Sequence, residues 1–369
     1  MAKTKVKHPS VEEREAKGKG CRKETPVSSH TGWAPAPDRP DPVALLEEQN
    51  LTREEDLVPV RHGRMMVSPF TFYRGAAKIM AADLKDTPRA GLIAQLCGDA
   101  HLSNFGVFAS PERTLLFDLN DFDETLPGPF EYDVKRMSAS FTIAARNNAF
   151  TKDETRDVTL TAVRAYREAM AQFAQMGTLD IWYARLSEEQ LLETIQLAVA
   201  TSKGKALKKA AEGMEKTARA NVAKAHTRDS LQALSKLGEL VDGRYRIVSQ
   251  PPIVIPAREL GGSFGLSADE IEHVIREQLR SYRASLQDDR RQLLERYEII
   301  DVARKVVGVG SVGTRAFIAL LQGRDQQDPL FLQVKEATKS VLEDHLPKSK
   351  FKQPGERVVQ GQRMMQAAS

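Results

Sequence analysis

Helical spacing of the apolar residues alternates with a few short apolar runs along this chain. The spacing predicts helices at residues 42–50 (PVALLEEQN) and 71–84 (TFYRGAAKIMAADL). Short apolar runs predict strands at 91–99 (GLIAQLCGD) and 114–121 (TLLFDLND), with a loop rich in turn-forming residues between them. The chemically unusual residues of the chain lie around these two strands.

The middle of the chain is predicted to be mainly helical. Residues 133–200 have the pattern of successive amphipathic helices, and 202–230 that of a solvated, lysine-rich helical hairpin, which we favour over an RNA-binding arm. An extended segment at 244–256, interrupted by two prolines, leads to a helix predicted over 268–297. We therefore expect a helical lobe in this part of the protein.

The two ends of the chain differ from this middle. Residues 1–42 are rich in Lys, Glu, Gly and Pro and carry too little apolar surface to offset the entropy of ordering, so we expect a mobile, disordered tail. Apolar segments at 315–322 and 329–336 are joined by a polar turn and predict a β-hairpin. The fold class is therefore α+β, with the tail followed by a mainly helical part at 43–300 and a small β-rich part at 301–369.

Composition narrows the class of protein. Of the 369 residues 41% are hydrophobic, enough for a sizeable core, and the net charge of +4 is spread along the chain, so we expect no nucleic-acid partner. Cys21 and Cys97 are far apart and give neither a disulfide framework nor a cysteine-rich metal site. We find no apolar run long enough to span a membrane and no export signal, and expect a cytoplasmic protein.

Oxygen-bearing side chains gather around the two predicted strands. Asp99 and Asn104 stand five residues apart in a loop, a spacing that lets a carboxylate orient a hydroxyl nucleophile while an amide oxygen holds a divalent metal ion. The second strand ends among Asp118, Asp121 and Asp123, and carboxylates at this density suit Mg²⁺ that bridges phosphates. The alternative is that Asp99 and Asn104 cap turns and the aspartates form a surface cluster.

Two other metal chemistries fit these residues less well. A metallophosphatase could use Asp99 and His101 but needs further histidine ligands, and the remaining histidines stand in no matching motif. An EF-hand that begins at Asp118 needs a small oxygen ligand and then a glycine where the chain has Phe122 and Asp123. The EF-hand is therefore excluded.

The segment GVGSVG at 308–313 matches the pattern GxGxxG, which two unrelated nucleotide-binding folds use. A dinucleotide-binding fold requires a helix after the glycines, whereas here a predicted hairpin follows and its second strand ends in a lysine. A glycine loop over phosphates with a strand-borne lysine is the kinase arrangement, although a plain surface lysine is the alternative. The residues predicted to bind the nucleotide are Gly308, Gly310, Ser311, Gly313 and Lys335.

Four segments carry a family resemblance: SPFTFYRGAA, CGDAHLSNFG, FDLNDFDETLPGPFEYDVKR and VVGVGSVGTRAFIALLQGRD. Through them residues 45–369 resemble the bacterial family known as domain of unknown function 2252, a likeness that implies kinship but no substrate. At motif level, GDAHLSN also resembles the catalytic loop H-G-D-x-H-x-x-N of aminoglycoside and choline phosphotransferases. That second resemblance implies a kinase-like fold and the use of ATP and Mg²⁺.

The phosphotransferase resemblance assigns roles in the first loop. It makes Asp99 the catalytic aspartate, His101, the second histidine of the loop, a further catalytic residue, and Asn104 a metal ligand. Cys97 stands where the pattern has its first histidine, which affects the packing of the loop rather than its chemistry.

The same resemblance extends to NDFDETLPGPFEYD. It implies that Asp121 is a metal ligand and that Asp133, at the start of the next helix, braces the catalytic loop. Asp123 and Asp118 are the alternates for these roles, Asp123 as a metal ligand and Asp118 as structural support.

The order of the motifs departs from that of kinases. The glycine loop and lysine precede the catalytic loop in kinases but follow it here, so the resemblance implies a circularly permuted, two-lobe fold, which compact lobes permit. Members of the family continue past this C-terminus, so we expect part of the nucleotide lobe to be missing. The glutamate that pairs with Lys335 is left open among Glu336, Glu343 and Glu356.

These residues support three hypotheses. The first is Mg²⁺-dependent phosphate transfer from ATP, or another nucleoside triphosphate, to a hydroxyl on an unknown small molecule or protein. It predicts that Lys335 and Gly310 lie within about 15 Å of Asp121, the reach of a triphosphate and a lysine side chain. The second is a non-catalytic, pseudokinase-like nucleotide-binding module, and the third a metal-dependent phosphohydrolase. Arg74 and Arg136 either bind an anionic substrate or pair with carboxylates, and the oligomeric state is open.

Overall fold

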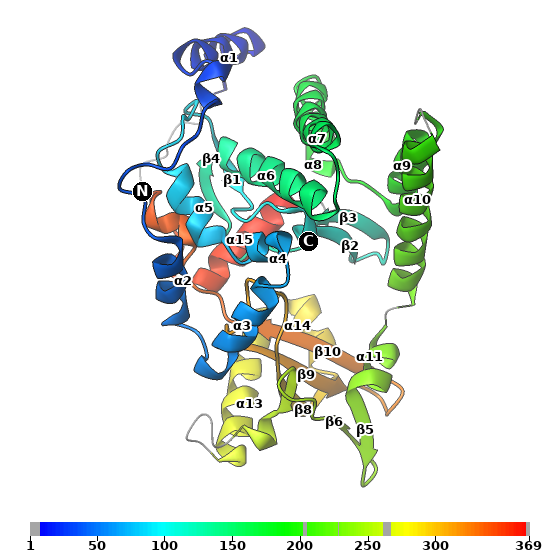
Figure 1. Ribbon diagram of the computed structural model, residues 1–369. Helices are drawn as coiled ribbons and strands as arrows, with labels where there is room; N and C mark the ends of the chain where they lie inside the picture. Colours follow the sequence, from blue (N-terminus) through cyan, green and yellow to red (C-terminus); the bar gives the residue numbers. More distant parts are fainter. Residues whose placement is uncertain (1–7, 202–204, 228, 261–266, 367–369) are drawn as a thin grey trace.

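The computed structural model describes residues 8–201, 205–227, 229–260 and 267–366 and shows a mixed α and β protein, as the sequence predicts (Figure 1). The α-helices are α1 (Val11–Glu24), α2 (Pro42–Asn50), α3 (Val58–Met65), α4 (Pro69–Arg74), α5 (Ala77–Leu84), α6 (Glu131–Asn147), α7 (Lys152–Phe173), α8 (Thr178–Tyr183), α9 (Glu188–Thr201), α10 (Lys205–His226), α11 (Ser230–Leu237), α13 (Ala268–Ser285), α14 (Asp288–Leu294) and α15 (Pro354–Met365). The strands are β1 (Ile93–Leu96), β2 (Phe105–Ala109), β3 (Leu115–Leu119), β4 (Leu126–Pro129), β5 (Gly238–Val241), β6 (Arg244–Ile247), β7 (Val254–Pro256), β8 (Glu298–Lys305), β9 (Ala316–Gln322) and β10 (Pro329–Lys335).

The largest sheet has the antiparallel order β10-β9-β8-β7. The predicted hairpin is confirmed as β9 and β10, with Ala316 opposite Lys335. Two elements from earlier in the chain complete the sheet, because β7 pairs with β8 and β8 with β9. The predicted part boundary at residue 300 therefore falls inside β8, and the sheet begins before it. The prolines around β7 make this strand hard to recognise in the sequence. Its partner, β8, lies more than forty residues later in the chain.

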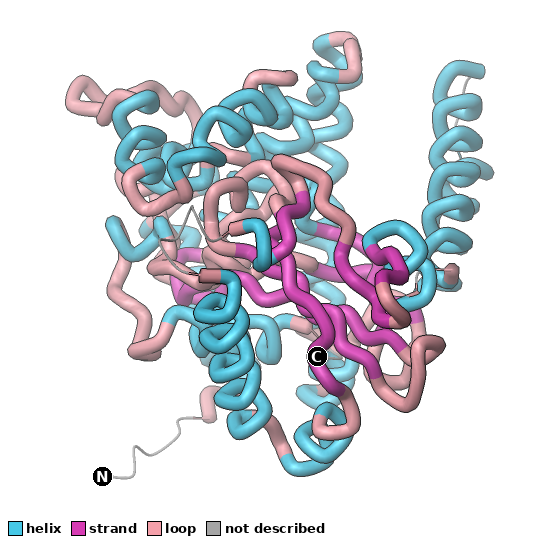
Figure 2. Tube along the Cα trace, turned by 90° about the horizontal axis from the view of Figure 1, so that it is seen from below, coloured by secondary structure: helices cyan, strands magenta, loops and turns pink. Residues whose placement is uncertain are grey.

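Helices cover one face of this sheet. The segment predicted as one helix over 268–297 is two, α13 and α14, and both pack on the sheet through Leu279, Leu294 and Leu321. Figure 2 shows the strands from below with helices beside them. The apolar face of these helices and the buried side of β8 and β9 thus form one core, which gives the sheet a rigid base.

Both strands predicted around the acidic residues are confirmed, but they do not pair with each other. β1 pairs with β4, and β3 pairs with β2, a strand that lies within the predicted loop. Leu96 and Leu126 of the first pair pack with Leu84 of α5 and Leu342. The 97–104 loop enters the β2–β3 hairpin and residues 120–124 leave it at the same open end, where Phe105 pairs with Leu119, so the two acidic segments lie side by side.

Residues 336–366 are not part of the sheet. A 3-10 turn at Val341–Asp344 packs against α5, and α15 lies against β1, so the predicted part 301–369 is divided between the sheet and the core around β1. The Arg357 side chain of α15 is buried and donates to the carbonyl oxygens of Thr125 (2.7 Å) and Asp123 (2.8 Å). This helix therefore holds the segment that follows β3.

Two peripheral helical segments project from this body (Figure 1). The expected disordered tail contains α1, where Ser10 and Glu13 form a capping box that stabilises the helix locally although none of its residues is buried. The α9–α10 pair agrees with the predicted lysine-rich hairpin, of which residues 202–204 and 228 lie outside the described residues. Among the described helices, none has the length and apolar character needed to span a membrane.

Candidate functional site

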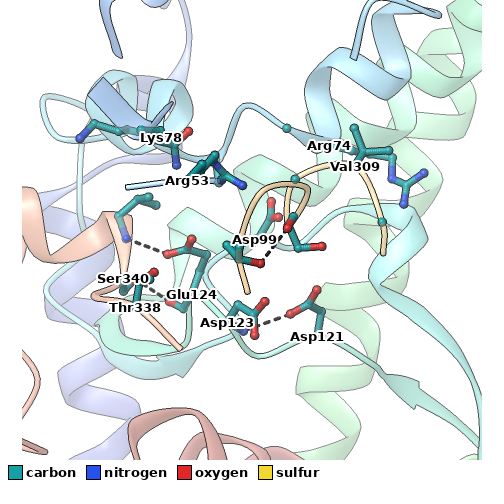
Figure 3. A pocket seen from close by; sticks show the side chains of 18 of the residues that line it. Arg53, Arg74, Lys78, Asp99, Asp121, Asp123, Glu124, Val309, Thr338 and Ser340 are labelled. Carbon is teal, nitrogen blue, oxygen red and sulfur yellow. Dashed lines mark hydrogen bonds between the residues drawn. The ribbon is translucent and has the colours of Figure 1, made fainter. Parts of the chain in front are cut away.

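Three loops from distant parts of the sequence line one cavity of about 450 Å³. They are the 97–104 loop after β1, the acidic loop (residues 120–124) after β3, and the glycine loop (residues 308–313) between β8 and β9. Figure 3 shows Val309 of the glycine loop above Asp99, with Asp121 and Asp123 below. The expected convergence is observed, because Gly310 lines the same cavity as Asp121 and the Lys335 Nζ atom lies 2.8 Å from Asp123 Oδ2.

Asp133 fixes the start of the 97–104 loop. Its carboxylate accepts hydrogen bonds from the backbone amides of Cys97 (2.7 Å) and Gly98 (3.0 Å), which is the contact that the bracing role requires. Burial raises the Asp133 pKa to about 6, although both hydrogen bonds oppose the shift. Gly98 has φ +85°, and a Cβ atom there would lie 2.2 Å from the Glu124 carbonyl oxygen, so glycine is needed.

The Asp99 carboxylate is held by a buried arginine. Arg136 of α6, only 2% exposed, donates from Nε to Asp99 Oδ1 at 2.5 Å and also bonds the Tyr73 carbonyl oxygen. Burial lowers the pKa of Arg136, but the charge of Asp99 outweighs it and the pKa is raised overall. Arg136 thus pairs with a carboxylate, and the second oxygen of Asp99, Oδ2, is turned toward His101 at 3.7 Å.

His101 and Asn104 complete this loop. His101 is buried, and burial is the main reason that its pKa is lowered to about 4, so the ring is neutral near pH 7 and forms no ion pair with Asp99. Asn104 Nδ2 donates to the Asp99 carbonyl oxygen at 2.7 Å. This bond fixes the amide and leaves its oxygen as the atom that a cation would meet.

The acidic loop places two carboxylates beside one lysine. Burial, followed by the charge of Asp123, raises the Asp121 pKa to about 6. Burial lowers the pKa of Lys335, but Asp121 and Asp123 outweigh it and raise it overall. The partner of Lys335 is therefore Asp123 and none of the expected glutamates. Glu336 bonds Arg315 instead, at 2.8 Å.

The residues that line the cavity differ from the predicted set. They include three acidic residues that were not predicted, Glu48, Glu124 and Asp344, and they do not include the predicted residues Asp118, Asp133, Gly313 and Lys335. Glu124 lines the cavity and accepts the Val341 amide at 2.7 Å, and burial raises its pKa to about 7. Its position directly after Asp123 was the only sequence signal. Asp118, on β3, accepts the Leu119 amide at 2.8 Å, and its supporting role stays a prediction.

The glycine loop is docked on the segment 53–75, which the sequence did not reveal. Arg64 Nη1 donates to the Gly308 carbonyl oxygen at 2.6 Å, and the Glu54 amide donates to that of Gly313 at 2.8 Å. At Gly310 a Cβ atom would lie 2.9 Å from the Arg74 carbonyl oxygen. Gly308, Gly310 and Ser311 face the cavity, whereas Gly313 lies against Arg53 and is not among the cavity-lining residues.

No three His, Cys, Asp or Glu side chains within the described ranges are arranged to hold a metal ion by themselves. The predicted ligands Asn104, Asp121 and Asp123 do lie in one cavity. A divalent ion here would need further oxygen atoms from a bound molecule, as Mg²⁺ does in many phosphate-binding sites.

Comparison with known proteins confirms the expected family and assigns no function to the chain. No curated protein and no solved structure matches this chain. Residues 53–369 match the family described as "Uncharacterized protein conserved in bacteria (DUF2252)". This match covers the 97–104 loop, the acidic loop, the glycine loop and Lys335. The chain therefore belongs to the bacterial family of domain of unknown function 2252.

Proposed function

We propose that this protein is a kinase-like phosphotransferase that transfers phosphate from ATP, or another nucleoside triphosphate, to a hydroxyl acceptor with the help of Mg²⁺. The observation that carries the proposal is the ion pair of Lys335 with Asp123, two residues 212 positions apart in the chain. This ion pair brings Lys335, from the sheet whose strands flank the glycine loop, next to the carboxylates of the acidic loop. A phosphate chain lies between such groups in kinases.

The arrangement of parts supports a circularly permuted, two-lobe fold. The sheet with the glycine loop corresponds to a nucleotide lobe, and the helices around β1 and β4 to the lobe with the catalytic loop. The cavity between them, about 450 Å³, is within the range of small-molecule sites.

The residues present fit a divalent cation. Asp121 and Asp123 share one lysine, and the raised pKa of Asp121 shows that its charge is incompletely compensated. Asn104 and Asp121 would hold the ion, with Asp123 beside them. Bound Mg²⁺ would neutralise charge on the transferred phosphate.

The remaining roles belong to the chain itself. Asp99 Oδ2, the oxygen that Arg136 leaves free, orients the acceptor hydroxyl, and Asp133 keeps the loop in place through its two backbone bonds. Lys335 and the backbone of Gly308 and Gly310 bind the phosphates. His101, neutral near pH 7, packs beneath Asp99 rather than exchanging protons.

The test measures nucleotide binding and phosphate turnover on the full chain. ATP with Mg²⁺ is expected to raise the melting temperature, by an amount that follows ligand concentration. Lys335→Ala should abolish this stabilisation, and Asp99→Asn should retain it while turnover is lost. Exposed Arg146→Gln on α6 serves as the control. Absence of any nucleotide effect on the unaltered chain would refute the proposal.

One observation favours a second candidate, a non-catalytic nucleotide-binding module. Buried Arg136 already holds Asp99 Oδ1 in an ion pair, so this carboxylate anchors the 97–104 loop to α6. Nucleotide stabilisation that survives Asp99→Asn, with no turnover in either protein, would point to this module. Mg²⁺-dependent ester hydrolysis unaffected by Lys335→Ala would instead indicate a phosphohydrolase centred on the acidic loop.

A further inference from the structure

Arg74 is a cationic residue of the cavity that has no partner of its own in the described part of the protein. Three nearby lysines already form ion pairs with carboxylates. Lys335 pairs with Asp123, Lys78 with Glu48 at 2.8 Å, and Lys339 with Asp344 at 2.6 Å. Arg74 lines the same cavity, yet its guanidinium makes no hydrogen bond or ion pair with any described residue, and its Nε atom is buried.

This distinguishes Arg74 from other arginines that have a buried nitrogen atom without a hydrogen bond. In each of those arginines another nitrogen of the same guanidinium is bonded, so the group is already anchored. They are Arg53, Arg61, Arg136, Arg283, Arg304 and Arg357. A buried guanidinium nitrogen without any partner is costly, and an oxyanion is the natural partner for its planar donors.

The backbone of Arg74 is held firmly, although its side chain is not. Arg74 ends α4, a short helix with a capping box at Ser68 and Thr71, and Gly75 follows as its C-cap. The Arg74 carbonyl oxygen lies against Gly310, which ties this position to the glycine loop. Figure 3 shows the Arg74 side chain next to Val309. A fixed backbone beside the expected phosphate loop, with an unengaged side chain, describes a binding group rather than a structural one.

We propose that Arg74 binds an oxyanion, phosphoryl or carboxylate, of a substrate in this cavity. The inference rests on the proposed function, because it names the chemistry of a substrate of the same site. The oxyanion has two possible sources, the terminal phosphate of the nucleotide or an anionic group on the acceptor. Both place negative oxygen atoms between Arg74 and the glycine loop, and the planar guanidinium recognises both.

The experiment compares the unaltered full chain with Arg74→Gln, Arg74→Lys and the control Arg146→Gln, which changes an exposed arginine of α6. Calorimetry measures the affinities for inorganic phosphate, acetate, Mg²⁺-ADP and a non-hydrolysable Mg²⁺-ATP analogue. We expect Arg74→Gln to weaken oxyanion binding about tenfold or more and Arg74→Lys to weaken it less, since a charge-assisted bond is lost or only altered. The melting temperature of ligand-free Arg74→Gln should be equal to that of the unaltered chain or higher, because the substitution removes a buried nitrogen atom that has no partner.

The pattern of losses identifies the source of the oxyanion. Weaker binding of the ATP analogue with unchanged ADP binding indicates the terminal phosphate. Unchanged binding of both nucleotides, with loss of phosphate or acetate binding in the presence of ADP, indicates the acceptor. Arg74-dependent phosphate binding without nucleotide binding would leave this inference standing while the proposed function fails. Equal affinities in all variants, no binding of any probe, or a lower melting temperature of ligand-free Arg74→Gln would overturn it.

Discussion

Replacing Asp121 by asparagine should stabilise the ligand-free protein at neutral pH while it removes a proposed metal ligand. The Asp121 pKa rises from 3.8 to about 6 because the carboxyl is buried and lies beside Asp123. Since the folded protein binds this proton more tightly than the unfolded chain, the carboxyl favours folding fully below the unfolded pKa, and that contribution is lost as the pH rises through about 6.

The size of the effect follows from the shift. About two pKa units correspond to roughly 3 kcal/mol, a net value that already includes the opposing attraction of Lys335. Because an asparagine amide reproduces the hydrogen bonds of a protonated carboxyl only in part, we expect a gain of about 1–3 kcal/mol. The difference in the free energy of unfolding between Asp121→Asn and the parent protein should be near zero at pH 4, increase up to pH 6 and stay level above it. In the same variant, stabilisation by Mg²⁺-ATP should disappear.

Urea unfolding of the two proteins from pH 4 to 8, in chelator and without nucleotide, measures this difference. Asp157→Asn, which changes an exposed aspartate of α7, is the matched control and should stay within about 0.5 kcal/mol at every pH. A stability difference that does not depend on pH, or a variant less stable than the parent at pH 7.5, would refute the electrostatic reasoning.

Three further substitutions test the loops of the cavity. Asp133→Ala leaves two backbone amides of the 97–104 loop without an acceptor and should cost about 2–4 kcal/mol in urea unfolding; a loss below about 0.5 kcal/mol would contradict the bracing role. Lys335→Gln removes a partly exposed ion pair with Asp123, so thermal unfolding should show less than about 1 kcal/mol of change while calorimetry shows loss of Mg²⁺-ADP binding. Gly310→Ala places a methyl group 2.9 Å from the Arg74 carbonyl oxygen and should cost about 1–3 kcal/mol and weaken nucleotide binding; unchanged values for both would show that the glycine loop is not docked as described.

Strands and hairpins whose formation depends on residues close in the sequence could be predicted from local sequence patterns. The β9–β10 hairpin was predictable because a short polar turn joins two apolar runs, and β1 and β3 because each is a short run of mainly apolar residues. β2 was missed because Phe105–Ala109 is short and flanked by turn residues. β7 lies within the extended segment predicted at 244–256, but its pairing with β8, through Lys305, could not be predicted from a proline-interrupted pattern.

The candidate site was predictable in its residue types but not in its pairings. Asp99, Asn104 and Asp121 stand in recognisable spacing, and the structure brings them into one cavity. The partner of Lys335 could not be predicted, because the bond to Asp123 joins segments 212 residues apart. The pairing of Arg136 with Asp99 likewise depends on how α6 lies against the 97–104 loop, which spacing along the chain does not specify.

Because Arg357 contacts the acidic loop, this loop cannot reach its final geometry until Arg357 has been synthesised. The loop is held through the Asp123 carbonyl oxygen by a guanidinium that the ribosome adds 234 residues later. During synthesis the carboxylates of the loop therefore exist long before the arginine that fixes their backbone, and a nascent chain that ends before α15 lacks the finished geometry. The acidic loop therefore reaches its final geometry only after the segment that carries the glycine loop has also been made.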